Sequence, residues 1–308
     1  MKIVHFSEIN KEILSDAEDY INSCCVSYDK LCEDTAIKVS ETSNIRPIIL
    51  LSGPSGSGKT TTALKIEACL DAMGKETHTI SMDNYFLPKE QIKESEDGKI
   101  DYEAPERIDI TLLQDHILKL ANCEEITIPS FNFKTQSRQN GKRLKRKKGE
   151  MVIFEGIHAL NPEVTGFDDL ASTIYISVRT RIQLSNGELF HPEMIRLMRR
   201  MIRDKKYRNR KISETLDMFD SVQRGENLYI NPYKQRAHIE LDTFHGFEVC
   251  SFKNILLEEL ILIKTHYNAY NQFLQIENVL KDLESVDENL IPSDSLIREF
   301  IGGSSLKY

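Results

Sequence analysis

The fold of this chain is decided by one stretch, Ile48-Ile49-Leu50-Leu51-Ser52-Gly53-Pro54-Ser55-Gly56-Ser57-Gly58-Lys59-Thr60. Its last eight residues fit the pattern G-x-x-x-x-G-K-[ST] at every fixed position. An apolar run typical of a buried strand leads in, and helical spacing of apolar residues leads out, at Ala63, Ile66, Leu70 and Met73. This context of strand, loop and helix separates the motif from an ordinary glycine-rich turn before a helix.

The same loop predicts a phosphate-binding site. Its glycines allow a tight turn whose backbone N–H groups point inward as an anion cradle. The helix that starts there adds its positive dipole end. Lys59 supplies a positive charge for the β- and γ-phosphates, and Thr60 offers a hydroxyl to Mg²⁺. We therefore expect a nucleotide-binding P-loop, with contacts from Gly53, Ser55, Gly56, Ser57, Gly58, Lys59, Thr60 and Thr61.

Length and composition are those of an ordinary globular chain. The 308 residues are 40% hydrophobic and 29% charged, enough for one large α/β domain with appendages or two small domains. The net charge of −8 argues against a nucleic-acid or membrane partner. The six cysteines show no metal-binding spacing and indicate reduced thiols. With neither a signal peptide nor a membrane span expected, the predicted location is the cytoplasm.

Strand and helix patterns alternate through the first two thirds of the chain. Apolar runs at 48–51, 77–82, 151–154 and 172–178 are typical of buried strands. Their alternation with helices predicts an α/β fold, with a mostly parallel sheet that carries helices on both faces. A short strand at 125–129 is also expected.

Two flanking regions predict helical extensions. Residues 1–45 carry helical spacing, and residues 246–308 are mainly helical. One strand is expected near 237–242 and another near 247–251. The predicted domains are thus a helical N-terminal extension at 1–45, a P-loop domain at 46–245 and a mainly helical C-terminal extension at 246–308.

Two acidic residues follow predicted strands. In doubly wound sheets, ligands bind at the carboxyl ends of the strands. Asp83, one strand away from the P-loop, is well placed to accept a proton from a hydroxyl that attacks a γ-phosphate; the alternative is an ordinary turn aspartate. Glu155 follows four apolar residues, where P-loop proteins hold an acid near Mg²⁺. The predicted metal residues are therefore Thr60 and Glu155.

A purely cationic helix face is expected between residues 193 and 206. Four arginines share it at spacings of three and four, and two more follow: Arg196, Arg199, Arg200, Arg203, Arg208 and Arg210. Only Asp204 interrupts the series. Like charges so close repel, so we expect an anion to compensate them, and triphosphate is the natural candidate. The alternative is a solvated face.

Two further stretches keep two interpretations each. In Ile128-Pro129-Ser130-Phe131-Asn132-Phe133, the aromatic residues form either part of the core or a stacking platform for a flat ring. The basic run at 142–148 fits a solvated hairpin tip better than a nucleic-acid patch, because no aromatic residues are interleaved with it.

Together these motifs resemble the uridine kinase/phosphoribulokinase family of P-loop kinases, and its uridine kinase branch most closely. The resemblance spans about residues 46–242, and residues 291–303 resemble the end of the uridine kinase-like proteins of clostridia. It implies a P-loop kinase fold, ATP as phosphate donor and Mg²⁺ as cofactor. Ser81-Met82-Asp83-Asn84-Tyr85-Phe86 is similar to the family's S-x-D-x-F-Y, which makes Asp83 the base for a nucleoside 5′-hydroxyl and adds Tyr85 to the acceptor site.

The resemblance also assigns the acceptor site. In the segment 102–109, Glu103 stands where an aspartate usually holds the ribose hydroxyls. The stretch ending in Phe131 and Phe133 is similar to I-P-x-Y-D-F, whose aromatics sandwich the pyrimidine. Gln136 stands where the uridine/cytidine kinases place a base-reading histidine, while Arg138 is retained. The departures cluster on the base pocket, so the sequence supports a kinase more firmly than it supports uridine.

The arginine series is similar to the family's R-R-x-x-R-D…R-G-R, a lid that closes over ATP. The resemblance gives Arg203 and Arg208 a catalytic role with Lys59 and Asp83, and gives Arg200 and Arg210 a role in binding ATP. The predicted activity is ATP-dependent phosphorylation of a nucleoside 5′-hydroxyl, with uridine or cytidine as the small-molecule partner. The alternatives are a phosphoribulose- or pantothenate-like acceptor, or a non-catalytic ATP-binding regulator. The sequence leaves a homo-oligomer open.

Overall fold

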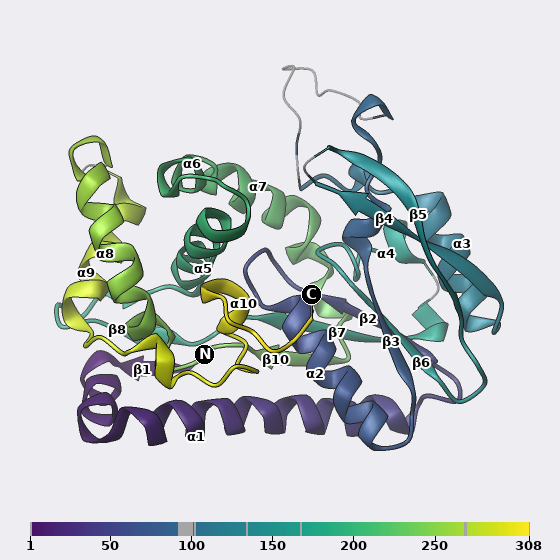
Figure 1. The fold of residues 1–308 in the computed structure, drawn as a ribbon, viewed down its shortest axis with the longest axis horizontal. Coiled ribbons are helices and arrows are strands. Elements are labelled where there is room, and N and C mark those ends of the chain that lie inside the picture. Colours follow the sequence, from purple (N-terminus) through teal and green to yellow (C-terminus); the bar gives the residue numbers. More distant parts are fainter. Residues whose placement is uncertain are drawn as a thin grey trace.

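A five-stranded sheet in which all strands run parallel forms the centre of the computed structural model (Figure 1). The model describes residues 2–91, 101, 103–133, 135–166, 168–267 and 270–307. The strand order is β10-β7-β2-β6-β3. The strands are β2 (Ile48–Ser52), β3 (Thr77–Ser81), β6 (Met151–Glu155), β7 (Ala171–Ser177) and β10 (Ile239–Asp242).

The sheet is buried on both faces, which explains why its central strands are continuous apolar runs. Alternate residues of β2 and β6 belong to two separate apolar clusters, one on each face. One cluster contains Ile49 and Ile153 together with α2 (Lys59–Ala72) and α5 (Pro192–Tyr207). The other faces α3 (Ile110–Ala121) and α4 (Pro162–Thr165). The predicted α/β fold with helices on both faces is confirmed.

The N-terminal region forms a strand and a long helix. β1 (Ile3–His5) pairs in parallel with β8 (Arg181–Gln183). On its other side, β8 pairs antiparallel with β9 (Leu189–Phe190). α1 (Phe6–Glu41) then runs beside α2, with non-helical backbone at Asp16 (Figure 1). The Tyr28 hydroxyl lies 2.6 Å from the Thr62 hydroxyl. The region therefore shares its core with the sheet, while the domain boundaries at residues 45 and 245 stay a prediction.

From α5 onward the chain is mainly helical, as expected, and β10 lies where the sequence predicts a strand near 237–242. Its helices are α5, α6 (Ile212–Asp217), α7 (Phe219–Tyr229), α8 (Glu248–Tyr267), α9 (Asn271–Asp282) and α10 (Arg298–Ile301). Within the described residues, no helix has the length and apolar character needed to cross a bilayer.

Two predicted strands differ in the structure. The strand expected near 247–251 is wrong, because α8 begins there. A short apolar run fits a buried helix as well as a strand, and here Val249, Cys250 and Phe252 enter the core. The strand expected at 125–129 is longer: β4 (Glu125–Asn132) forms an antiparallel hairpin with β5 (Ser137–Lys145), outside the main sheet (Figure 1).

The basic run between residues 142 and 148 is mostly exposed, as expected, but it does not form the tip of the hairpin. It covers the last residues of β5 and the loop after it, at the end away from the turn between β4 and β5. Arg146 is different, because its side chain is buried. Its guanidinium donates to the carbonyl oxygens of Leu120 at 2.7 Å and Ala121 at 2.8 Å, in the last turn of α3. One cation of this run is therefore a helix cap and not a surface charge.

Candidate active site

The P-loop joins the carboxyl end of β2 to the first turn of α2. Gly58 is the N-cap of α2 and has φ of +88°, and Gly56 has φ of +75°. Both lie in the left-handed region that favours glycine. A Cβ at Gly58 would also come within 2.6 Å of Leu296. The loop backbone therefore needs glycine both for its conformation and for the close approach of the C-terminal residues.

The inner surface of the loop carries unsatisfied polar groups. The Lys59 ammonium donates to the Pro54 carbonyl at 3.3 Å. The Ser57 hydroxyl is fully buried and has no hydrogen-bond partner among the described residues. Burial lowers the pKa of Lys59, while the negative charges of Glu155 and Asp83 act in the opposite direction. A buried hydroxyl donor and a half-buried ammonium at a helix N-terminus are suited to bind an anion.

The predicted acids lie next to this loop. Glu155 ends β6, and strand register places it opposite Leu51 of β2 and Ser81 of β3. The Thr60 hydroxyl lies 3.4 Å from Glu155 Oε1. Burial first, and the charge of Asp83 second, raise the pKa of Glu155 to about 7. Strand topology thus brings Asp83, Glu155 and Lys59 together at one edge of the sheet.

Glu103 lies within the electrostatic influence of Lys59 and Asp83. Its side chain packs against Gly225 of α7, where any Cβ would collide with it. Its Oε2 atom is buried and has no hydrogen-bond partner among the described residues. Removal from water raises the pKa of Glu103, against the positive charges of Arg200 and Lys59. The carboxylate is held close to the predicted base, while Tyr102 of the same motif lies outside the described residues.

Two of the arginines on α5 have carboxylate partners within the protein. Arg196 binds Glu226 through both nitrogens, at 2.6 and 2.8 Å, and donates to the Ser55 carbonyl. Arg199 is fully buried and binds Glu248 at 2.6 and 3.1 Å. A second set of bonds from Arg199 reaches the carbonyl oxygens of Gly56 and Thr243. These two arginines hold the outside of the P-loop and do not face its anion cradle.

Three further arginines share one carboxylate, that of Asp204. It is fully buried and lies 2.8 Å from Arg203 and 3.5 Å from both Arg208 and Arg210. Burial opposes ionisation of Asp204, but the charges of the arginines around it lower its pKa. Burial and the charge of Arg203 lower the pKa of Arg208 to about 10. Three carboxylates among the described residues, Glu226, Glu248 and Asp204, therefore offset half of the positive charge of the six arginines. Protein groups do part of what we expected of an external anion, and binding of a triphosphate by the remaining charge stays a prediction.

Arg200 has no carboxylate hydrogen-bond or ion-pair partner among the described residues. It donates to the Ser55 hydroxyl, and its Nε atom is buried without a partner. Burial first, and the charge of Arg203 second, lower the pKa of Arg200. A buried guanidinium with unused donors beside the P-loop is the cation of this series best suited to a phosphate.

The aromatic residues of the acceptor side lie against one another. Phe131 and Phe133 have ring centroids 5.2 Å apart at 75°, and Phe86 meets both rings edge-to-face. Phe131 is in β4, and Phe133 follows the last residue of that strand. Phe131 is buried, whereas Phe133 is 52% exposed. The expected sandwich with a base between Phe131 and Phe133 is not formed here, and the cluster presents the ring of Phe133 to solvent.

Three other predicted acceptor residues are committed to local contacts. Gln136 has φ of +51° at the hairpin turn and donates to the Phe133 carbonyl at 2.9 Å. Arg138 binds Asp109, the N-cap of α3, at 2.8 Å. Tyr85 is fully buried with its hydroxyl 2.9 Å from Nδ1 of His116, so its side chain lies in the core and does not line the site. The sequence alone does not predict which way these three side chains point.

A model of the phosphoribulokinase/uridine kinase family matches residues 48–248. The chain belongs to this family. It is a P-loop kinase in which Lys59 begins α2, and Asp83 and Glu155 lie at the carboxyl ends of β3 and β6 beside the phosphate loop.

The kinase is similar to two curated proteins named uridine kinase. The Ureaplasma urealyticum protein is 26% identical over 195 residues, and a Clostridium botulinum protein is 29% identical over 202 residues. The matches cover 63% of this kinase and 86% and 87% of the relatives. A solved structure, a proposed fructose transport system kinase from a Silicibacter species, is 18% identical with a TM-score of 0.52. That match covers 70% of this kinase and 98% of the solved chain, and it shows the common fold.

Several residues that shape the site of this kinase were not predicted. Glu226 and Glu248 lie 30 and 49 residues from the arginines that they neutralise. Glu299 reaches the P-loop from the last helix and accepts hydrogen bonds from Thr61. No spacing rule links residues so far apart, so the sequence offers no signal for these pairs.

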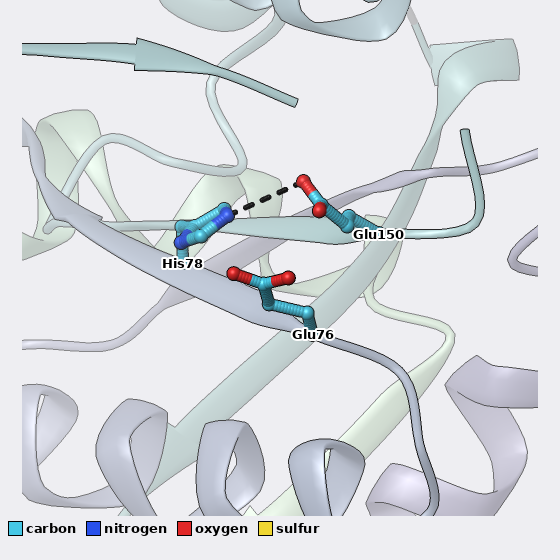
Figure 2. Close-up of side chains that lie close together, drawn as sticks. All are labelled: Glu76, His78 and Glu150. Carbon is cyan, nitrogen blue, oxygen red and sulfur yellow. Dashed lines mark hydrogen bonds and ion pairs between the residues drawn. The ribbon is translucent and has the colours of Figure 1, made fainter. Parts of the chain in front are cut away.

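A second cluster of ionisable groups lies at the opposite end of the strands. Glu76, His78 and Glu150 have potential metal-ligand atoms within 4.8 Å of one another (Figure 2). The ammonium of Lys147 lies 3.0 Å from Glu150 and 3.6 Å from Glu76. The single positive charge of Lys147 is shared between the two carboxylates, and with the contact between His78 and Glu150 the cluster is an ion-pair network that ties β3 to β6.

Proposed function

We propose that this kinase transfers the γ-phosphoryl group of ATP to the 5′-hydroxyl of a nucleoside, with uridine or cytidine as the acceptor. The convergence of Lys59, Asp83 and Glu155 at the P-loop edge of the sheet carries the proposal. Named uridine kinases among the similar proteins support the choice of acceptor. Because the reaction consumes ATP, we propose the cytoplasm as its location.

The donor side neutralises charge and fixes position, which is most of what phosphoryl transfer requires. The P-loop N–H groups and Lys59 bind the phosphates, and Arg200 approaches from α5. Arg203, Arg208 and Arg210 stay paired with Asp204 and contribute positive charge at the rim of the site.

The residues present fit a Mg²⁺ ion. Glu155 is a buried carboxylate whose pKa is raised partly by the charge of Asp83, and a divalent cation would relieve this repulsion. Thr60 and Glu155 would hold the ion, through a water in the case of Glu155. Bound there, Mg²⁺ neutralises charge on the β- and γ-phosphate oxygens.

The acceptor side performs the proton transfer. Asp83 accepts the proton of the 5′-hydroxyl as that oxygen forms its bond to the γ-phosphorus and the bond to the β–γ bridging oxygen breaks. Glu103 offers unused acceptor capacity for the ribose hydroxyls. The exposed ring of Phe133 offers one face on which a base can stack.

A second acceptor class has a specific observation in its favour. Phe131 and Phe133 are in direct contact, so the structure as it stands has no slot between them for a flat ring. An acceptor without a base, such as a phosphoribulose- or pantothenate-like molecule, does not require that slot. A non-catalytic ATP-binding regulator is the weaker alternative, because a switch has no need of Asp83 beside the P-loop.

The test is kcat/KM for uridine, cytidine, adenosine, guanosine, phosphoribulose and pantothenate under identical Mg·ATP conditions. We expect uridine or cytidine to be phosphorylated best, with a relaxed preference because Gln136 replaces a base-reading group. Turnover of phosphoribulose or pantothenate without any nucleoside would overturn the nucleoside assignment. If 2′-deoxy analogues react as well as ribosides, Glu103 does not hold the ribose.

A further inference from the structure

The C-terminal segment, residues 288–303, places a carboxylate on the P-loop helix. Glu299 in α10 accepts a hydrogen bond from the Thr61 backbone N–H at 3.2 Å and another from the Thr61 hydroxyl at 2.6 Å, both to its Oε2 atom. These residues are 238 positions apart. Figure 1 shows α10 in the space between α2 and α5.

The contact lies at the N-terminal end of α2, where backbone donors are available. Thr61 is the third residue of α2, so its N–H is one of the helix donors without an intrahelical acceptor. Such N–H groups after a glycine-rich loop bind phosphate oxygens when a nucleotide is present. A carboxylate carries the same sign of charge and the same kind of acceptor atom as a phosphate. Glu299 and a nucleotide phosphate therefore require the same donors.

The charge of Glu299 also reaches the rest of the site. It is among the charges that favour the protonated form of Lys59 and the protonated form of Glu155. The carboxylate thus adds negative potential at the place where the donor brings several negative charges.

The backbone that carries Glu299 is firmly anchored. Leu296, Phe300 and Ile301 belong to the main apolar cluster, and Leu296 packs on Gly58. The Arg199 guanidinium lies 5.1 Å above the centre of the Phe300 ring. Lys206 donates to the Ile301 carbonyl. Because Glu299 itself is only half-buried, its side chain can rotate away while the segment stays in place.

We propose that Glu299 is a built-in anionic competitor that occupies phosphate-binding donors of the P-loop and thereby sets the affinity of this kinase for its phosphate donor. The inference rests on the proposed function, since it assumes that a nucleotide phosphate binds at the start of α2. Donor binding then requires displacement of the Glu299 side chain. The competition acts on the phosphates and not on the nucleoside part of the donor.

The experiment compares two variants with a matched control. Glu299→Gln removes the charge and keeps the shape, and Glu299→Ala removes the acceptor as well. Glu288→Gln makes the same charge change at an exposed position of the same segment. Calorimetric titration gives Kd of the full-length proteins for Mg·ATP, for inorganic triphosphate with Mg²⁺ and for adenosine, and steady-state kinetics give KM for ATP and kcat separately.

We expect both Glu299 variants to bind Mg·ATP and inorganic triphosphate roughly tenfold more tightly or better, since a charge-assisted competitor has been removed. The affinity for adenosine should not change, and Glu288→Gln should behave as wild type. Unchanged or weaker binding of both phosphate probes by the Glu299 variants, with normal turnover, would overturn the inference and leave the kinase assignment intact. If neither wild type nor any variant binds Mg·ATP, the proposed function fails and the inference fails with it.

Discussion

The two sides of the site are held in different ways. On the phosphate side, Arg196 and Arg199 of α5 form buried ion pairs and also donate hydrogen bonds to carbonyl oxygens of the P-loop. The loop conformation itself depends on its glycines. On the acceptor side, Phe133 and Gln136 lie near the end of a two-stranded hairpin outside the main sheet. The phosphate side is therefore braced by several buried elements, while the acceptor side depends on a few side chains at the surface.

This difference matches the chemistry that each side must perform. Phosphate neutralisation needs fixed charges, and reorganising them during reaction would cost free energy. Acceptor recognition tolerates variation, because stacking on an exposed ring does not require a unique geometry. We infer that substitutions on the phosphate side reduce rate or stability strongly, whereas substitutions on the hairpin mainly alter acceptor preference.

The largest effect is expected for Lys59→Ala. Loss of the P-loop ammonium should lower kcat by roughly 10³-fold, because a fixed charge at the developing phosphate charge is removed, while the fold is retained. Lys65→Ala on the same helix is the control, since Lys65 binds Asp29 and not the loop. Steady-state kinetics at saturating ATP and a thermal melt provide the measurement. Near wild-type turnover would show that the loop has no catalytic role.

The arginine series allows a matched test within one helix. Arg199→Met should destabilise the protein by about 3–5 kcal/mol, because Glu248 is left buried and uncompensated. Arg200→Met should change stability by less than about 1 kcal/mol and lower kcat by roughly 10²-fold, because Arg200 has no carboxylate to leave behind. Urea unfolding and kinetics separate the two effects. Equal loss of stability in both variants would contradict the distinction between bracing and phosphate-binding arginines.

Asp83→Asn tests whether Asp83 acts on the acceptor hydroxyl or on the phosphate donor. Without a base, kcat should fall by roughly 10²-fold, while Kd for Mg·ATP stays within about twofold of wild type. Asp115→Asn on the surface of α3 is the control, because among the described residues Asp115 forms an ion pair with Lys119 and with no group of the site. If ATP affinity is lost and kcat is normal, Asp83 belongs to the donor side.

The smallest effect is expected for Phe133→Ala. The ring is 52% exposed, so stability and ATP affinity should hardly change. The kcat/KM for uridine should fall less than tenfold, and the ratio between nucleosides should change. Leu118→Ala removes a similarly exposed apolar side chain from α3 as a control. A fall of 10²-fold or more for every nucleoside would mean that the acceptor side is as strictly built as the phosphate side.

Local sequence was enough to predict the centre of the site. The P-loop, the position of Asp83 after β3 and the position of Glu155 at the end of β6 depend on short patterns and on the alignment of parallel strand ends. The α/β fold follows from the same patterns, because alternating strands and helices leave few arrangements that bury both faces of a sheet.

Only the tertiary structure decided which charges remain for a ligand. The arginines of α5 are equivalent in sequence spacing, yet distant carboxylates neutralise Arg196 and Arg199 and leave Arg200 without such a partner among the described residues. The same holds for Glu299 on the P-loop and for Phe131 against Phe133. The physical reason is that backbone conformation is set by neighbours in the chain, whereas the pairing of side chains is set by packing between segments that the sequence separates by tens to hundreds of residues.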